Sequence, residues 1–323
     1  MTEVAGRRVD VFSLPMNVRF RGVQHREGVL IAGPAGVGEF SPFWDYDVAE
    51  SSAWLAAALD AADHAFPTAV RDRISVNCTV PAVEPDQARA IVLAPHGCRT
   101  AKVKVAEAGQ SLDADVGRVA AVRDALGPGG RVRVDANGGW SVDEAVHAIG
   151  VLAAFDLEYV EQPVATVEDL ALVRRRVDVP IAADESIRRA ADPARVKQLG
   201  AADLAVLKVQ PLGGVPASLR LAEEIAMPVV VSSALESSVG IAAGVALAAA
   251  LPELPYACGL ATTSMFTADV VASSVRPVDG QLDVRRVDPD PDAVDAVRAD
   301  ADTTARWHRR LAECLAFLED LPR

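Results

Sequence analysis

Two regular patterns of apolar residues divide the chain. In the first part, up to about Pro95, apolar and polar residues alternate in two segments typical of β-strands, and a Gly-Pro-Ala-Gly turn and a short third strand follow. Apolar residues then recur at helical spacing in two segments. The predicted strands span 8–14, 28–32 and 37–40, and the predicted helices span 48–65 and 85–93. Strands followed by helices indicate a segregated α+β unit.

From Ala101 onward, short runs rich in Val, Ile and Leu alternate with helical stretches. The predicted strands span 101–105, 131–136, 158–163, 180–186, 204–209, 228–233 and 256–260. Ser141 and Thr166 precede two of the helices, with an acid three residues further on, as in a capping box. The polar residues that mark successive strand ends are Lys104, Asp135, Glu161, Asp184, Lys208 and Ser233, and they are 31, 26, 23, 24 and 25 residues apart. This near-constant period favours a parallel (β/α) barrel, although the spacing alone also fits an open doubly wound sheet.

The regular pattern fades after Gly259. A hairpin turn is predicted at 278–282, and one long helix is predicted at 291–318 with Trp307, Leu311, Leu315 and Leu318 on one side. We expect this tail to pack against the first part of the chain. The predicted organisation is therefore an N-terminal α+β capping domain (1–95), a barrel domain (96–270) and a C-terminal segment that returns to the cap (271–323).

Composition narrows the classes of function. The 32 basic and 45 acidic residues give a formal charge of −13, which argues against nucleic acid and anionic membrane surfaces as partners. The N-terminus lacks the apolar stretch of a signal peptide, and the most apolar segment, 239–251, is too short to span a bilayer. The four cysteines have no metal-binding or disulfide-framework spacing. We therefore expect a cytoplasmic protein with reduced thiols and no membrane insertion, and we make no prediction of its oligomeric state.

The polar residues at the strand ends are the candidates for chemistry, because in a barrel these ends converge on one pocket. Asp135, Glu161 and Asp184 are carboxylates on three successive strands, and carboxylate oxygens are the ligands that Mg²⁺ prefers. The lysines that flank them are Lys102, Lys104 and Lys208. A divalent cation between opposed lysines suits proton abstraction next to a carboxylate, since the cation stabilises the enediolate and a lysine takes the proton.

Each of these residues has an ordinary structural interpretation when taken alone. An Asp at a strand end is usually a helix N-cap, and a pair of lysines can lie on a solvated strand edge. Lys102 and Lys104, however, are two residues apart in an apolar strand, so both point to the same side, which in a barrel is the interior. Interior charges need partners, a metal or a substrate. The combination is therefore far more specific than any member of it.

Five short motifs carry a resemblance to a known family. They are Lys102-Val-Lys104, Val134-Asp135-Ala-Asn137, Val160-Glu161-Gln-Pro163, Ala183-Asp184-Glu185-Ser186 and Leu207-Lys208. In order and spacing they resemble the muconate-lactonising-enzyme subgroup of the enolase superfamily, and the resemblance covers essentially the whole chain. It implies a modified (β/α)₇β TIM-like barrel with an α+β capping domain formed by the N-terminal part and the C-terminal tail.

Within the subgroup, the chain resembles most the family of o-succinylbenzoate synthases. The short chain, the segment 232–240 and the turn 38–42 carry this closer resemblance. It implies a carbon–oxygen lyase of menaquinone biosynthesis that removes water from 2-succinyl-6-hydroxy-2,4-cyclohexadiene-1-carboxylate, a small-molecule carboxylate. Racemases of N-succinylamino acids and dipeptide epimerases of the same superfamily are the alternatives. A non-catalytic binding protein is a third hypothesis, which predicts loss of a ligand or lysine, and none is lost.

The resemblance also implies a role for each motif residue. Asp135, Glu161 and Asp184 ligate Mg²⁺; Lys104 removes the proton α to the carboxylate and returns it to the departing hydroxyl; Lys208 stabilises the enediolate as a cation; and Lys102 lies beside the carboxylate oxygens and lowers the pKa of Lys104. Asn137 and Glu185 either orient the ligands or serve as a turn residue and an ion-pair partner. We also expect Asp184 to lie in a pocket and not in the packed barrel core.

Two further groups are candidates for contact with substrate. Ser233, Ser238 and Gly240 lie where a strand passes into a helix, and N–H groups at a helix start bind carboxylates, although serine is also a common N-cap without any ligand. The aromatic residues of the predicted capping loop, Phe43, Trp44 and Tyr46, either shield the pocket from water or pack at a domain interface. The five histidines sit in no ligand pattern and are assigned no role.

Overall fold

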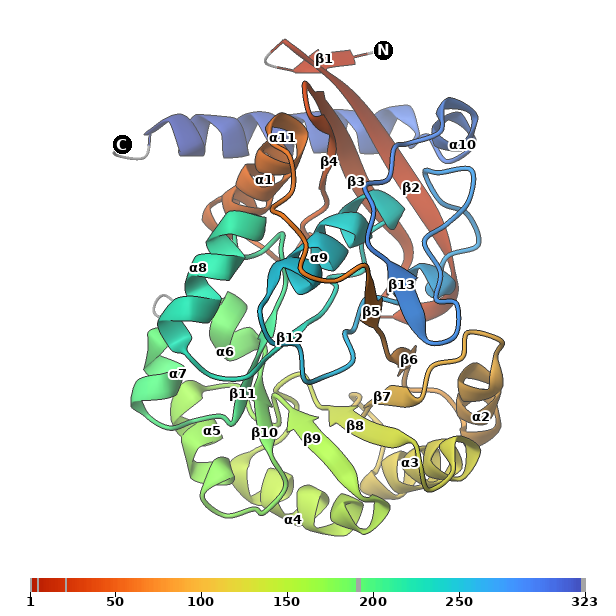
Figure 1. Ribbon diagram of the computed structural model, residues 1–323, viewed down its shortest axis with the longest axis vertical. Helices are drawn as coiled ribbons and strands as arrows, with labels where there is room; N and C mark the ends of the chain where they lie inside the picture. Colours follow the sequence, from red (N-terminus) through yellow and green to blue (C-terminus); the bar gives the residue numbers. More distant parts are fainter. Residues whose placement is uncertain (1, 5, 21, 190–192, 321–323) are drawn as a thin grey trace.

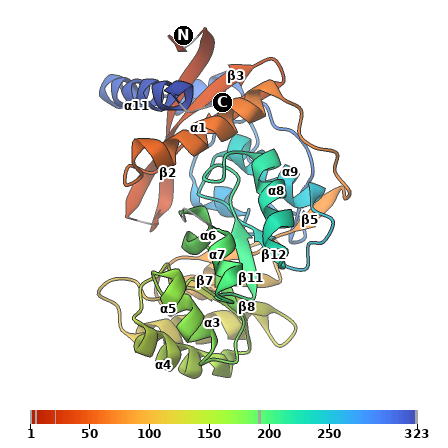
Figure 2. The ribbon, with the colours of Figure 1, turned by 90° about the vertical axis from the view of Figure 1, so that its left-hand side faces the viewer.

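The structure is a computed structural model that describes residues 2–320 except residues 5, 21 and 190–192. An antiparallel sheet and its covering helices form a cap at the top of Figure 1, and a curled parallel sheet lies below it. The side view in Figure 2 shows the cap at one end of the curled sheet. This architecture confirms the predicted barrel with an α+β cap.

The cap sheet has the strand order β1-β2-β3-β4, and neighbouring strands are antiparallel. Its two long strands extend further than predicted, because their alternation continues through polar residues whose side chains are half-buried or exposed. The predicted helix follows and begins with a capping box in which the Asp47 side chain accepts from the Glu50 N–H. The elements are β1 (Thr2–Val4), β2 (Arg7–Phe20), β3 (Val23–Gly33), β4 (Gly36–Phe40) and α1 (Val48–Asp63).

The parallel sheet has the order β12-β11-β10-β9-β8-β7-β6, and helices on its outer face connect successive strands. The N-caps predicted from sequence are present: Ser141 forms a full capping box, and Thr166 accepts from the Asp169 N–H. The strands are β6 (Cys78–Val80), β7 (Thr100–Lys104), β8 (Arg131–Asp135), β9 (Leu157–Glu161), β10 (Ile181–Ala183), β11 (Leu204–Leu207) and β12 (Val229–Val231). The helices are α2 (Pro85–Leu93), α3 (Leu112–Leu126), α4 (Val142–Leu152), η1 (Ala153–Phe155), α5 (Val167–Arg174), α6 (Glu185–Arg188), α7 (Ala194–Gln198), α8 (Val215–Ile225), α9 (Ser238–Ala250) and η2 (Thr262–Met265).

The strand predicted at 256–260 is reduced to two isolated bridges. Cys258 pairs with Val76 in parallel on one side, and Gly259 pairs with Ser232 in parallel on the other. The pairing is too short to form a regular strand, yet it joins the two edges of the sheet. This segment therefore takes the eighth position in the ring.

The barrel sheet begins before residue 95, earlier than the predicted domain boundary. Its first strand, β6, has only three residues, which is too short for a recognisable pattern of apolar residues. The preceding strand, β5 (Arg73–Ser75), pairs with β13 (Gln281–Asp283), the strand that follows the predicted hairpin turn. The C-terminal segment therefore contacts the edge of the barrel before it returns to the cap.

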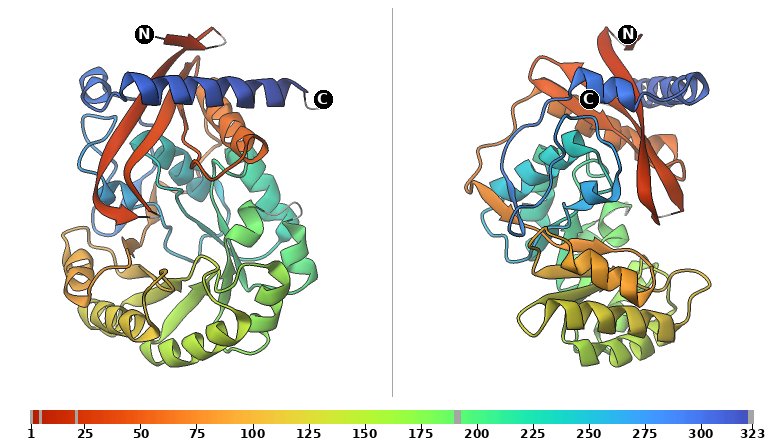
Figure 3. Two further views of the ribbon diagram at one scale, coloured as in Figure 1. Left: turned by 180° about the vertical axis from the view of Figure 1, so that it is seen from behind. Right: turned by 90° about the vertical axis from the view of Figure 1, so that its right-hand side faces the viewer.

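The single long helix predicted at 291–318 is wrong. The segment forms α10 (Pro291–Ala296) and α11 (Ala301–Asp320), with an extended break between them that pairs with β2. Asp300 accepts from the Thr303 N–H and so caps the second helix. In the rear view of Figure 3, α11 crosses in front of the cap strands, and it packs against α1, as the predicted return to the cap requires.

Two expectations about the chain as a whole can be compared with the structure. All four cysteines are buried free thiols. None of the helices among the described residues has the length and apolar character needed to cross a bilayer.

Side chains that point into the barrel form two layers. We call the layer near the strand beginnings the floor; it contains Arg133, Tyr159, Ala182, Leu204, Val206, Val230 and Tyr256. We call the layer near the strand ends the mouth; it contains Lys102, Lys104, Asp135, Glu161, Asp184 and Lys208. Because side chains two residues apart share a face, β8 contributes Arg133 to the floor and Asp135 to the mouth.

Candidate active site

The mouth brings together all six of the charged residues predicted from the strand ends. Strand β7 provides two lysines, β8 and β9 each end in a carboxylate, and Asp184 and Lys208 directly follow β10 and β11. The mouth faces the cap, and the tip of the β2–β3 hairpin reaches down to it (Figure 3, left). Five of the six residues are buried, and Lys104 is half-buried.

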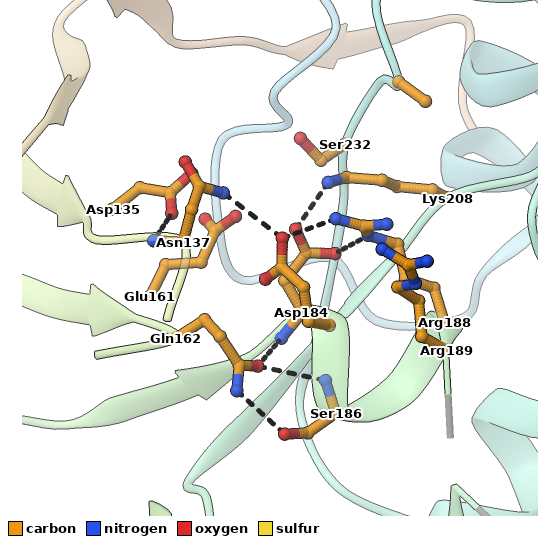
Figure 4. A network of polar contacts seen from close by, with 12 residues as sticks. Asp135, Asn137, Glu161, Gln162, Asp184, Ser186, Arg188, Arg189, Lys208 and Ser232 are labelled. Carbon is orange, nitrogen blue, oxygen red and sulfur yellow. Dashed lines mark hydrogen bonds and ion pairs between the residues drawn. The ribbon is translucent and has the colours of Figure 1, made fainter. Parts of the chain in front are cut away.

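The order of the strands sets these side chains on defined sides of the ring. Strands β7 and β11 are separated by three strands in a ring of eight positions, so Lys104 and Lys208 come from opposite sides of the mouth. The intervening strands β8, β9 and β10 carry the three carboxylates on one arc between them. Figure 4 shows this arc, with Asp135 and Glu161 at one side and Lys208 at the other.

Every carboxylate of the arc has a cationic partner. The Lys102 Nζ lies 2.9 Å from both oxygens of Glu161, and the Lys104 Nζ lies 2.5 Å from Asp135 Oδ2. The Lys208 Nζ lies 2.5 Å from Asp184 Oδ2. Among the described residues, no three His, Cys, Asp or Glu side chains converge closely enough in this arrangement to hold a metal ion.

The pKa values of the charged residues on the arc are shifted in different directions. Burial acts to raise the pKa of Asp135, but Lys104 and Lys102 hold it well below its usual range. For Glu161, burial and the neighbouring carboxylate of Asp135 raise the pKa to about 7 despite the contact with Lys102. Burial lowers the pKa of Lys208 more than the adjacent Asp184 restores it. The carboxylates repel one another, so a cation placed among them relieves that repulsion.

The pKa of Lys102 moves in the direction opposite to its burial. Desolvation acts to lower it, but Glu161 and Asp135 together raise it above the ordinary lysine value. Lys102 therefore stays charged. Its ammonium group forms ion pairs with two carboxylates, Glu161 at 2.9 Å and Asp135 at 3.3 Å.

Asn137 and Glu185 were expected either to orient the ligands or to serve as a turn residue and an ion-pair partner. The Asn137 side chain accepts from the Lys104 Nζ at 2.5 Å and donates to Glu185 Oε1 at 3.3 Å, and its backbone N–H donates to Asp135 Oδ1 at 3.1 Å. Asn137 also has a left-handed backbone with a φ of 47°, and Glu185 forms an ion pair with Arg188 at 2.5 Å. The contacts therefore fit both interpretations.

A cavity opens at the mouth, and the predicted substrate residues divide over it. Its lining consists of Phe20, Thr79, Lys102, Lys104, Asp135, Asn137, Lys208, Ser232, Ser233, Ala234, Leu235, Gly259 and Thr262. Ser233 is therefore on the cavity wall, with its Oγ 2.7 Å from the Thr262 hydroxyl. Ser238 and Gly240 do not line the cavity.

The start of α9, where we expected a substrate carboxylate to bind, is filled by the protein's own acids. The Gly240 N–H donates to Glu39 of the cap at 3.1 Å, and the Ser238 hydroxyl donates to Asp269 at 2.6 Å. These partners come from positions far from the helix in sequence, so the local pattern does not reveal them. The helix start therefore has no donors left for substrate at these two residues.

The aromatic residues of the capping loop pack mainly within the cap. Phe43 and Tyr46 are buried and pack edge-on against Trp54, while Trp44 is 44% exposed and donates its indole N–H to Glu27. The aromatic side chain that does line the cavity is Phe20, at the hairpin tip, whose ring centre is 5.4 Å from the Lys104 Nζ.

Sequence reasoning missed Phe20 and two polar residues that support Asp184. Gln162 accepts from the backbone N–H groups of Asp184 and Ser186, at 2.9 and 3.1 Å, and so fixes the turn into α6. Arg188 contacts the Asp184 side chain directly, at 3.0 Å (Figure 4). The signal for Gln162 was its place in the Glu-Gln-Pro motif, whereas Arg188 sits in a sequence that looks like an ordinary short surface helix.

Comparisons with known proteins agree with this geometry. A family model described as enolase C-terminal domain-like matches residues 85–291, and one described as enolase N-terminal domain-like matches residues 11–62. The chain is 61% identical over 312 residues to the o-succinylbenzoate synthase of Thermobifida fusca (strain YX), and the match covers 97% of each chain. It is 55% identical to the o-succinylbenzoate synthase of Mycolicibacterium smegmatis, with 96% of each chain covered.

The chain belongs to the o-succinylbenzoate synthase family of the enolase superfamily. The predicted resemblance is thus confirmed, and the chain is an enzyme, a lyase by its family. A non-catalytic binding protein, the third hypothesis from the sequence, is thereby set aside.

Solved structures of the superfamily share the fold at low sequence identity. The muconate lactonizing enzyme of Pseudomonas fluorescens superposes with a TM-score of 0.79 at 21% identity, covering 91% of this chain and 98% of that one. The L-Ala-D/L-Glu epimerase of Bacillus subtilis superposes with a TM-score of 0.75 at 23% identity, covering 88% and 96%. These neighbours have different activities, so the specific reaction of the chain must be argued from its own family and its own site.

Proposed function

We propose that the chain catalyses the Mg²⁺-dependent syn elimination of water that converts 2-succinyl-6-hydroxy-2,4-cyclohexadiene-1-carboxylate to 2-succinylbenzoate in menaquinone biosynthesis. The observation that carries this proposal is the placement of Lys104 and Lys208 on opposite sides of the mouth, with three carboxylates on the arc between them. The names of the close relatives support the substrate.

The residues of the arc fit Mg²⁺ by their chemistry. Asp135, Glu161 and Asp184 supply only carboxylate oxygens. The raised pKa of Glu161 reflects its burial first and then its repulsion by Asp135, which a cation would relieve. These three side chains would hold the ion, and Lys102, Lys104 and Lys208 would release them. When bound, Mg²⁺ supplies Lewis-acid stabilisation of the negative charge that develops on the substrate carboxylate.

Charge balance favours the entry of a divalent cation together with a dianionic substrate. Four cations, Lys102, Lys104, Arg188 and Lys208, face four carboxylates, Asp135, Glu161, Asp184 and Glu185. The site is thus close to neutral before it is loaded. A 2+ ion and a substrate with two carboxylates preserve that balance.

Lys104 is assigned the proton transfers. To act as a base it must be neutral and must leave Asp135 and Asn137, which it contacts in this structure. It then takes the proton from the ring carbon that bears the carboxylate, the C–O bond to the hydroxyl breaks, and the same proton leaves with the hydroxyl as water. One residue on one face suffices for a syn elimination, and the product ring is aromatic.

Lys208 is assigned the opposite face, where it provides positive charge without transferring a proton. It lines the cavity together with Ser233 and Thr262, and we assign the neutral hydroxyls of these two residues to the succinyl side of the substrate. Phe20 covers Lys104 from the cap and limits access of water to the base.

Racemisation of N-succinylamino acids is the second candidate, because a racemase needs a base on each face and both lysines are present. Epimerisation of dipeptides fits less well. Its substrate carries an α-ammonium group that needs an acidic partner, and among the described residues of the cavity lining Asp135 is the only carboxylate.

The test is a side-by-side assay of the purified protein. We expect ultraviolet absorbance to show formation of 2-succinylbenzoate with Mg²⁺ and no turnover after exhaustive chelation, and we expect Lys104→Ala to be inactive. N-succinylamino acids are assayed in parallel by loss of optical rotation. Efficient racemisation without dehydration would reverse the order of the two candidates, and full turnover without divalent cation would overturn the mechanism.

A further inference from the structure

Arg188 is a buried guanidinium that joins the barrel to the cap. It lies at the end of α6, and its side chain is 2% exposed. Its Nε lies 3.0 Å from Asp184 Oδ1, its Nη2 lies 2.5 Å from Glu185 Oε1, and its Nη1 donates to the Tyr46 hydroxyl. Figure 4 shows the guanidinium beside Asp184. Burying a charge is costly unless its partners are well placed, so these contacts need a reason.

The two oxygens of Asp184 are held by two cations of different character. Oδ1 contacts Arg188, and Oδ2 contacts the Lys208 Nζ at 2.5 Å. The guanidinium is a rigid planar fork that three partners fix in place, whereas the lysine ammonium ends a flexible chain. Oδ2 can therefore exchange Lys208 for another cation, while Oδ1 keeps its contact with Arg188.

The structure assigns Arg188 as a positioning residue that reserves Oδ2 of Asp184 for the divalent cation, with Tyr46 of the cap fixing Arg188 in turn. The inference rests on the proposed function, in which Asp184 is a ligand of Mg²⁺. With Oδ1 engaged, Asp184 offers a single oxygen in a single direction. Mg²⁺ demands near-ideal octahedral geometry, so it depends on this restraint more than Ca²⁺, which accepts flexible and bidentate coordination.

Tyr46 gives the cap a direct part in the site. It lies in the loop between β4 and α1, is buried, and packs edge-on against Trp54 with ring centres 5.4 Å apart. Its hydroxyl is thus held at a fixed position by the packing of the cap. Displacement of the cap would free one arm of Arg188 and with it the orientation of Asp184.

The neighbouring Arg189 provides a matched control. It also comes from the end of α6 and also contacts Tyr46, with its guanidinium 4.5 Å from the ring centre. Its ion-pair partners, however, are Glu50 at 2.8 Å and Asp45 at 3.5 Å, both in the cap. Arg189 therefore shares the location and the charge of Arg188 without touching a carboxylate of the mouth.

The experiment measures Mg²⁺ and Ca²⁺ dissociation constants by calorimetry, without substrate, for the parent and for Arg188→Lys, Tyr46→Phe and Arg189→Lys. Arg188→Lys keeps the charge and removes the fork, so we expect the Mg²⁺ dissociation constant to rise about 10- to 100-fold, the usual effect of losing a group that orients a ligand. The Ca²⁺ constant should rise less. Tyr46→Phe should shift Mg²⁺ in the same direction by a smaller factor, and Arg189→Lys should leave both constants unchanged.

Unchanged Mg²⁺ affinity in Arg188→Lys, or an equal loss for the two ions, would overturn the inference. If Arg188→Lys does not fold, Tyr46→Phe carries the test, because it removes a single hydroxyl, and an unshifted ratio of Mg²⁺ to Ca²⁺ affinity in that variant overturns it. The proposed function is tested separately by product formation in the parent. If the Mg²⁺ affinity of the protein depends on Arg188 but the parent forms no product, the proposed function is contradicted and the positioning role of Arg188 is retained.

Discussion

The floor and the mouth of the barrel are both buried and charged, yet they are built differently. At the floor, Arg133 is fully buried; its Nε lies 2.5 Å from Glu158, its Nη1 donates to Asn77 and to the Ala257 carbonyl, and its guanidinium lies 4.7 Å from the centre of the Tyr159 ring. At the mouth, lysines on flexible chains pair with carboxylates that crowd one another. Arg133 and Asp135 are two residues apart on one strand.

This difference separates a buried charge that stabilises the fold from buried charges that can bind a metal ion and a substrate. The floor has one buried cation, Arg133, which is fixed by a carboxylate, an amide, a carbonyl and an aromatic ring, although its Nη2 is buried without a hydrogen-bond partner among the described residues. The mouth has several cations and carboxylates in pairs that a metal ion and a substrate can replace. Burial alone therefore does not mark an active site; exchangeable pairing does.

The largest expected effect comes from the lysine assigned as the base. Lys104→Arg keeps the charge but cannot lose its proton, so we expect dehydration to fall on the order of 1,000-fold, within the range typical for loss of a general base. Lys208→Arg should retain a reduced but measurable rate, because Lys208 transfers no proton. The measurement is the initial rate of 2-succinylbenzoate formation. Equal losses in two folded variants would instead support a site with two bases.

The second prediction concerns the floor, where the effect should fall on stability and not on chemistry. Arg133→Met removes the nearer cationic partner of Glu158, whose side chain is only 12% exposed, and leaves it only Arg131 at 3.5 Å. We therefore expect the free energy of unfolding in urea to drop by about 3 kcal/mol. Mg²⁺ affinity of the folded variant should stay near that of the parent. Adding Glu158→Gln should restore part of the stability, since the carboxylate that has lost its nearer cation is then removed. A loss of Mg²⁺ binding with unchanged stability would reverse the roles given to the two layers.

The third prediction concerns Asp184, which was expected to lie in a pocket and not in the packed barrel core. It is fully buried between Arg188 and Lys208, so Asp184→Asn should weaken Mg²⁺ binding and also lower stability, because two buried cations lose their carboxylate. Mg²⁺ at 100 times its dissociation constant should stabilise the parent by about 2.7 kcal/mol and the variant far less. Urea unfolding with and without Mg²⁺ measures both effects. A variant that gains as much from Mg²⁺ as the parent would exclude Asp184 as a ligand.

The sequence predicted the parts of the fold that repeat. Six of the seven apolar runs predicted in the barrel overlap an observed strand, because a buried parallel strand needs such a run on both faces; the seventh, 256–260, forms only isolated bridges. Strands β5 and β6 were missed because their residues, Arg-Ile-Ser and Cys-Thr-Val, form no apolar run, unlike the equally short β10 and β12. The break between α10 and α11 was missed because the pairing of that segment with β2 depends on a contact across nearly the whole chain.

In the site, too, residues that follow a local pattern were predicted, and residues that depend on contacts between distant segments were missed. The six charged residues of the mouth could be found because they interrupt apolar strands at a constant spacing. Phe20 and Arg188 could not, since each looks locally like an ordinary residue of a hairpin or a short helix and reaches the mouth only through the packing of the cap on the barrel. Glu39 likewise occupies the start of α9 from a strand of the cap.

The smallest expected effect is a dependence of Mg²⁺ affinity on pH that belongs to the mouth alone. Burial and Asp135 raise the pKa of Glu161 from 4.5 to about 7. Below pH 7 a proton must leave Glu161 before its carboxylate can bind a metal ion, so Mg²⁺ affinity should fall by up to about tenfold per pH unit.

The raised pKa of Glu161 also means that the metal-free folded state binds this proton more tightly than the unfolded chain. Its contribution to stability is therefore present below about pH 4.5 and is lost as pH rises through 7, where Mg²⁺ compensates for it. Calorimetric dissociation constants between about pH 5.5 and pH 8.5 measure the slope, with Glu161→Gln as the control that should bind weakly and without pH dependence. Arg133 keeps its charge over this range, so the floor adds no slope of its own. A constant affinity in the parent across the range would show that Glu161 is already ionised, and the repulsion among the three carboxylates would then be weaker than the geometry of the arc indicates.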